Sequence, residues 1–194
     1  MAQRDTGTEQ LIKDTAKRIF FSEGKLHATT QDIADAAGVN RTLLNYYFRS
    51  RDILFEQVAN EARGEMSAVL DKVFTAELDF KDKLQQLINV FMDEAIKFPY
   101  REVYVVTELN RTDKTVPEEK KTRVKAFLKE ISAEMEKGKI KKMDPRQFCM
   151  NLFSLMAYPL ITNCLNKSIY NVNDAEYKKL MKDRKKVIFE LIYQ

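Results

Sequence analysis

A short segment of this sequence gathers side chains suited to binding rather than to packing alone. Its members are Arg41, Thr42, Leu43, Asn45, Tyr46, Tyr47 and Arg51. Residues 36–51 also hold three arginines and no acidic residue. Arginine and asparagine can form hydrogen bonds with base edges, and arginine, threonine and tyrosine can bind phosphate oxygens. This chemistry predicts contact with double-stranded DNA.

Two short helices joined by a tight turn are predicted to position these side chains. Thr30 is expected to cap the first helix, and Gly38 to end it in the left-handed conformation. Asn40 is expected to cap the second helix, which runs from Arg41 to Tyr47. The predicted inward-facing residues are Ile33, Ala34, Ala37, Val39, Leu44 and Phe48. This is the arrangement of a helix-turn-helix DNA-binding unit.

Three spaced segments, residues 16–24, 30–39 and 46–54, carry a resemblance to a known family. Residues from about 9 to 55 resemble the DNA-binding domain of the tetracycline-repressor (TetR) family of bacterial transcription regulators. The resemblance implies that Thr30, Tyr46, Tyr47 and Arg51 bind phosphates, and that Arg41, Thr42, Leu43 and Asn45 face base edges.

Asn45 departs from the family pattern, which usually has tyrosine or tryptophan at this position. Asparagine can form two hydrogen bonds with adenine in the major groove. We therefore expect the substitution to change the preferred DNA sequence without abolishing binding.

Charge is distributed unevenly along the 194 residues. The net charge is +4, but residues 1–62 carry nine acidic and eight basic side chains. The positive excess lies in residues 137–142 and in the lysines of 178–186, which we interpret as solvated surface. The basic segment 36–51 is therefore a local feature, and phosphate attraction acts over short distances at physiological salt.

Helical spacing recurs along the whole chain, and the predicted fold is all-α. An N-terminal three-helix helix-turn-helix domain, residues 1–52, precedes a six-helix regulatory and dimerisation domain, residues 53–194. The first helix, Glu9 to Glu23, is expected to bury Leu11, Ile12, Ala16, Ile19 and Phe20. The later helices are predicted at 52–74, 80–97, 100–109, 117–137, 145–169 and 173–193, with a polar loop at 110–116.

Cys149 and Cys164 fall in one predicted helix, about 22 Å apart, which is too far for a disulfide. The N-terminal residues do not resemble a signal peptide, so a cytoplasmic location is expected. Residues 147–166 carry no charge, but Pro159 interrupts them and their polar residues largely line up at helical spacing. We expect a helix buried between subunits rather than one in a membrane.

The sequence offers no chemistry for an enzyme. Its single histidine, His27, has no nucleophile motif near it, and no Cys/His cluster or glycine-rich phosphate loop is present. We therefore expect no catalytic residue, metal or cofactor.

The favoured function is a ligand-responsive DNA-binding regulator, most simply a repressor on a near-palindromic operator. The predicted homodimer pairs helices 145–169 and 173–193, because their apolar residues point in several directions. Phe91, Met92, Tyr104 and Phe127 are candidates for binding an apolar or aromatic effector, or else plain core residues. The alternatives are a helical interaction module and a lipid- or metabolite-binding protein without DNA binding.

Overall fold

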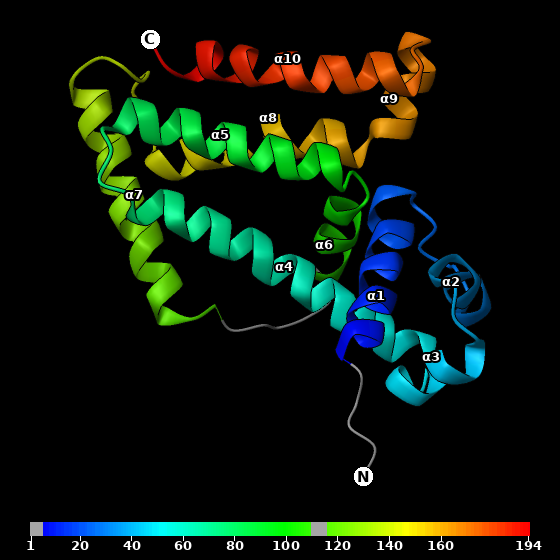
Figure 1. The fold of residues 1–194 in the computed structure, drawn as a ribbon. Helices are drawn as coiled ribbons and strands as arrows, with labels where there is room; N and C mark the ends of the chain where they lie inside the picture. The colour runs from blue at the N-terminus through cyan, green and yellow to red at the C-terminus, as the bar shows by residue number, and fades with distance from the viewer. Residues whose placement is uncertain (1–5, 110–115) are drawn as a thin grey trace.

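Amphipathic spacing and capping residues fold this chain into helices. The computed structural model describes residues 6–109 and 116–194, and every element within those ranges is helical (Figure 1). The elements are α1 Thr6–Lys17, η1 Arg18–Ser22, α2 Thr30–Ala37, α3 Arg41–Phe48, α4 Arg51–Thr75, α5 Phe80–Lys97, α6 Arg101–Leu109, α7 Glu118–Glu136, α8 Pro145–Ile161, α9 Asn163–Tyr170 and α10 Asp174–Ile192. The all-α prediction is confirmed. The predicted loop at 110–116 falls outside the described residues except for Val116.

The first helix closes in a π-helical turn, η1, that the sequence analysis did not predict. Ile19, Phe20 and Phe21 follow one another and are all buried. An ideal α-helix turns three consecutive residues to different sides, whereas a π turn locally shifts the register and lets all three reach the core. Leu11 was predicted to face inward and is 48% exposed, because the buried stripe of α1 runs through Ile12 and its neighbours on that face.

One hydrophobic core unites α1, η1, α2, α3 and the first half of α4. Its members from α4 are Leu54, Val58, Ala59 and Ala62. The predicted boundary between residues 52 and 53 therefore lies inside a packed unit that extends to about Ala62. Phe98, directly after α5, also joins this core and links it to the C-terminal helices.

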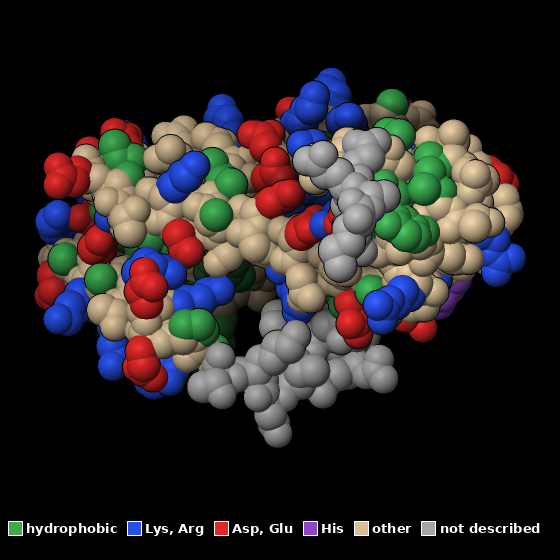
Figure 2. Space-filling model, turned by 60° about the horizontal axis from the view of Figure 1, so that its bottom comes forward, with side chains coloured by type: hydrophobic (Ala, Val, Ile, Leu, Met, Phe, Trp, Pro, Cys, Tyr) green, Lys and Arg blue, Asp and Glu red, His purple; other side chains and the backbone are tan. Residues whose placement is uncertain are grey.

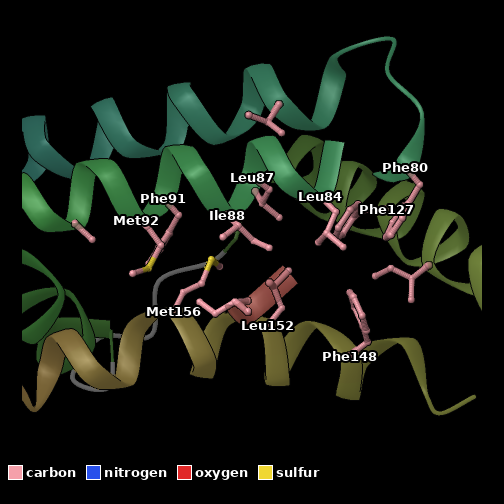
Figure 3. Packing of buried hydrophobic residues seen from close by; sticks show 14 of the residues in the cluster. Phe80, Leu84, Leu87, Ile88, Phe91, Met92, Phe127, Phe148, Leu152 and Met156 are labelled. Atoms are coloured by element: carbon pink, nitrogen blue, oxygen red, sulfur yellow. The ribbon is translucent and has the colours of Figure 1, made fainter. Parts of the chain in front are cut away.

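A second core lies between α5 and α8 and is closed by α7 and α10. Figure 3 shows the facing side chains, which are Leu84, Ile88 and Met92 of α5 and Phe148, Leu152 and Met156 of α8. Phe127 of α7 stacks on Phe80, with ring centroids 5.7 Å apart. Val73, near the end of α4, belongs to this second core. The 25-residue helix α4, about 37 Å long at 1.5 Å per residue, thus connects the two cores.

The predicted helix 145–169 is divided into α8 and α9, which meet at 72°. Pro159 has no N–H, so the carbonyl of Leu155 has no helical donor, and Arg184 Nε donates to it at 2.9 Å. The Tyr177 hydroxyl donates to the Pro159 carbonyl at 2.5 Å. The helix does bend, but the break lies at Thr162, after α8 has continued two residues past Pro159, and side chains of α10 bind the two carbonyls before it. Among the described residues, no single helix is long and apolar enough to cross a membrane, although the bent pair together meets that test by length and composition.

The end of α10 is fastened to α7 through a buried carboxylate. Glu134 accepts hydrogen bonds from Lys137 Nζ at 2.6 Å and from the Tyr193 hydroxyl at 2.8 Å. Burial acts to raise the pKa of Glu134, but these two hydrogen bonds outweigh it, so the pKa lies below its ordinary value. Burial, with donation to Glu134, raises the pKa of Tyr193 to about 12.

Candidate nucleic-acid interface

The cap of α2 is Thr29, whereas the sequence analysis predicted Thr30, one residue later. Thr29 Oγ1 accepts a hydrogen bond from Asp32 N at 3.2 Å, and the Asp32 carboxylate accepts one from Thr29 N at 2.8 Å. Hydrogen bonds from the backbone and the hydroxyl of Thr29 hold the pKa of Asp32 below its usual value. Thr30 is thus the first helical residue, at a helix end whose N–H groups attract anions.

The turn between α2 and α3 has the predicted geometry. Gly38 has φ 67° and ψ 28°, and the N–H of Val39 donates to the carbonyl of Ala34 at 3.0 Å. Asn40 Oδ1 then accepts from Leu43 N at 2.7 Å and caps α3. Gly38 as helix terminator and Asn40 as cap are both confirmed.

The helix α3 has one buried and one exposed face. Leu44 and Phe48 are in the core, and Leu43 is half-buried against it. The exposed side chains are Arg41, Thr42, Asn45, Tyr46 and Arg49 at the helix end, with Tyr46 at 59% exposure. Within α3, the spacing of Thr42, Asn45 and Tyr46 by one, four and five residues from Arg41 places them on one face, and Arg49 follows directly after the helix. This surface, called the α3 face below, brings together four of the predicted DNA-binding residues.

Tyr47 does not belong to the α3 face. Its side chain is 8% exposed, and its ring lies edge-on to Tyr46 with centroids 5.4 Å apart. Leu44, Tyr47 and Phe48 follow the i, i+3, i+4 spacing of a core-facing stripe. The structure therefore places Tyr47 in the core rather than on the surface that the resemblance implied.

Arg51, expected to bind phosphate, is directed into the protein. Its Nε donates to the Ala28 carbonyl at 3.3 Å, and Nη2 donates to the Leu26 carbonyl. Its guanidinium lies 4.8 Å from the ring centroid of Phe55, in cation–π contact. Asp52 pairs with Nη1 at 3.1 Å. These contacts connect the loop before α2 to the start of α4. Arg51 therefore stabilises the helix-turn-helix from within the domain.

Arg49 was counted among the basic residues but was not placed in the predicted site. It has φ 59° and ψ −42°, and Ser50 N donates to the Phe48 carbonyl at 2.6 Å across it. This is a γ-turn with positive φ, a strained conformation for a residue other than glycine. The turn leaves the Arg49 side chain exposed and lets Ser50 cap α4 through Ile53 N. Its exposure directly after the last residue of α3 makes it a neighbour of the α3 face.

Charges elsewhere on the molecule are mostly mixed. Figure 2 shows acidic and basic side chains interspersed over the visible part of the C-terminal helices. Two acidic residues of α4 are paired with α1, Glu61 with Lys13 at 2.8 Å and Glu65 with Lys17. On the α3 face itself the basic side chains are Arg41 and Arg49, and both are exposed.

The four predicted effector-binding residues do not form one site. Phe91 packs edge-on against Phe153, and Met92 is fully buried beside it in the second core. Phe127 is stacked on Phe80. Tyr104 lies against the first core, with its ring 4.9 Å from that of Phe55. These contacts are those of packing residues. Phe91, Met92 and Phe127 belong to the second core, whereas Tyr104 packs against the first.

A recognition helix with one face in the core and one exposed, preceded by a capped helix and a tight turn, defines a helix-turn-helix DNA-binding domain. Residues 12–58 match the family model of bacterial regulatory proteins of the tetR family. The N-terminal segment is therefore a DNA-binding domain of the tetR type, and the resemblance found in the sequence over residues 9–55 is confirmed for this segment.

Solved structures share the fold over nearly the whole chain. The fatty acid degradation regulator FadR from Bacillus halodurans is 18% identical, with 96% of this chain and 97% of that chain covered and a TM-score of 0.57. A transcriptional regulator from Cytophaga hutchinsonii is 18% identical, with 97% and 100% covered and a TM-score of 0.56. The TetR-family regulator HI0893 from Haemophilus influenzae is 16% identical, with 99% and 100% covered and a TM-score of 0.55. A comparison with curated proteins gave no significant match.

Proposed function

We propose that the protein is a transcriptional repressor that binds a near-palindromic operator as a homodimer and is released by a small molecule. The α3 face carries this proposal. It presents hydrogen-bonding side chains to solvent, while the opposite side of α3 is held by the core. A helix used only for packing would not need this combination of side chains. The regulator acts in the cytoplasm under this proposal, and its effector is apolar or aromatic.

The residues of the α3 face take different roles in the proposed complex. Arg41, Thr42 and Asn45 lie nearest the start of the recognition helix and read base edges, with Leu43 beside them in apolar contact. Phosphates are held by Thr30, Tyr46 and Arg49. In this assignment Arg49 takes the phosphate role first given to Arg51.

The proposed homodimer forms through α8 and α10. Apolar side chains of both helices are exposed, namely Met150, Tyr158, Leu180, Val187 and Leu191. Between the two helices lies a groove of about 870 Å³, lined by Phe153, Leu155 and Leu191 among others. An apolar surface of this kind marks an interaction site, and pairing with a second copy would build a four-helix bundle.

Light scattering tests the dimer. The parent should have twice the mass of the monomer at micromolar concentration, and Val187→Glu should lower the dimer fraction because it buries an unpaired charge in the interface. Val124→Glu on α7, also at an exposed valine, is the matched control and should stay dimeric. A monomeric parent contradicts the proposal.

Selection of duplexes from a random pool, followed by fluorescence anisotropy, tests DNA binding. The selected sequences should contain two inverted half-sites about one helical turn apart or slightly more. Arg41→Ala should weaken binding by about 1–3 kcal/mol. Lys179→Ala, at an exposed lysine of α10, should bind as the parent does.

A further inference from the structure

A cavity lies where the N-terminal bundle meets the C-terminal helices. It has a volume of about 330 Å³, within the size range of small-molecule sites. Ser22 and Glu23, at the end of η1, form one wall, and the turn between α5 and α6 contributes Pro99 and Tyr100. The opposite wall comes from the α8–α9 bend and α10. Figure 1 shows the end of the first helix directed toward α9. We call this space the junction cavity.

The lining of the junction cavity combines an apolar floor with a charged rim. Ile96, Leu160 and Met181 supply the floor. At the rim, Lys167 Nζ pairs with Asp174 at 2.7 Å. Glu23 pairs with Arg18 and with Lys25, the latter at 2.9 Å. With the exposed Lys178, the lining holds two lysines and two carboxylates, so its charges balance and it favours an uncharged molecule.

Tyr100 provides a hydrogen-bond donor at this cavity. Its hydroxyl lies 4.0 Å from Cys164 Sγ, a long contact to an atom that is a weak acceptor. Burial raises the pKa of Tyr100, so the phenol keeps its proton at neutral pH. A ligand oxygen at ordinary hydrogen-bond distance would replace a weak contact with a stronger one.

The geometry points to the junction cavity as the effector site, taking a largely apolar, uncharged molecule whose single acceptor oxygen binds the Tyr100 hydroxyl. This inference rests on the proposed function, because an effector acts by changing DNA binding. The sequence did not predict this location for the effector. The inference also narrows the expected effector from any apolar or aromatic molecule to an apolar molecule with one hydrogen-bond acceptor.

Tyr100 also connects the cavity to the helix-turn-helix. Its N–H donates to the Phe21 carbonyl at 3.0 Å, and its ring lies so close to Gly24 that a Cβ there would be 2.6 Å from the ring. Ser22 Oγ donates to the Lys97 carbonyl at 3.0 Å beside it. Movement of the Tyr100 ring toward a ligand would therefore change its contact with Gly24, in the loop that precedes α2. A ligand bound to Tyr100 would therefore have different affinities for two positions of the helix-turn-helix relative to the C-terminal helices. Allosteric control requires such a difference in affinity.

The uncharged naphthalene ketone Prodan is a suitable probe, because its emission reports burial and its carbonyl can accept from Tyr100. The chain has no tryptophan that would interfere with the signal. Prodan should bind the full-length parent, and Tyr100→Phe should weaken its binding about 3- to 10-fold through loss of one hydrogen bond. The control Tyr104→Phe removes a hydroxyl four residues away, in α6 and outside the cavity lining, and should bind Prodan as the parent does. No binding to the parent, or an effect of Tyr104→Phe alone, overturns the inference.

Filling the cavity provides a second test. Ile96→Trp occupies the apolar floor and should abolish Prodan binding, with folding checked by circular dichroism. In the parent, saturating Prodan should change the affinity for the selected duplex about fivefold or more, and the duplex should change Prodan affinity by the same factor. Prodan binding that leaves DNA affinity unchanged, or that survives both Tyr100→Phe and Ile96→Trp, overturns the effector role. A parent that binds Prodan but no DNA contradicts the proposed function instead.

Discussion

Replacing Gly24 with alanine probes the contact between the two halves of the molecule. Gly24 has φ +73°, and a Cβ at this position would lie 2.6–2.8 Å from three atoms of the Tyr100 ring. The left-handed backbone costs a residue with a Cβ about 1–2 kcal/mol. The ring must also retreat, and overpacking of this kind costs about 1–3 kcal/mol. Gly24→Ala should therefore lower the free energy of unfolding by about 2–5 kcal/mol, measured by urea denaturation at a fixed protomer concentration.

Gly138 supplies a matched control, since it has the same φ of +73° and no atom within 4 Å of its added Cβ. Gly138→Ala should lower the free energy of unfolding only by the cost of the left-handed backbone conformation, about 1–2 kcal/mol. The difference between the two variants measures the collision with Tyr100. In a Tyr100→Ala background, Gly24→Ala should cost clearly less than in the parent. Equal costs for Gly24→Ala and Gly138→Ala would refute the reasoning.

Three further substitutions test local features of the structure. Arg49→Gly should raise the free energy of unfolding by about 1 kcal/mol, because glycine adopts the positive φ without strain. The same substitution should weaken duplex binding. A lower free energy of unfolding would count against the γ-turn. Arg184→Ala should lower the free energy of unfolding by about 1–2 kcal/mol, because the Leu155 carbonyl loses its donor. In a Pro159→Ala background, which restores a backbone N–H, Arg184→Ala should lower it by less. The same loss in both backgrounds would contradict this role of Arg184. Because folding lowers the pKa of Glu134, its ionised form stabilises the protein above its unfolded pKa of about 4.3, and the contribution disappears as pH falls through the folded pKa. Urea denaturation at several pH values should show Glu134→Gln with a shallower acid decline than the parent, and parallel declines would rule the contribution out.

Local signals were sufficient for most of the helix-turn-helix. The caps and the turn glycine depend on neighbouring residues only, so Gly38 and Asn40 could be assigned from the sequence. The choice between Thr29 and Thr30 needed one more local signal, because only Thr29 has an acidic residue three positions later, at Asp32, that can complete a capping box.

Features that depend on distant parts of the chain could not be predicted. The direction of the Arg51 side chain is set by two carbonyls more than twenty residues away. The π turn follows from three consecutive apolar residues competing for one core, an outcome that regular periodicity does not represent. Pro159 indicated a bend, but its position depends on donors from Tyr177 and Arg184 of α10. The junction cavity is formed by several separate segments, so no single motif reports it.

Binding of the selected operator by the parent and by Asn45→Ala, across duplexes with each single base pair changed, tests the central claim most directly. If the α3 face reads DNA, the parent should prefer the operator strongly, with affinity that falls steeply as salt rises. Asn45→Ala should lose about 1–3 kcal/mol of discrimination at particular base pairs, keep its preference at the others and retain the salt dependence of the parent. If the parent binds all duplexes alike, or if Asn45→Ala shows the same base preferences as the parent, the assignment of α3 as the sequence-reading helix is contradicted.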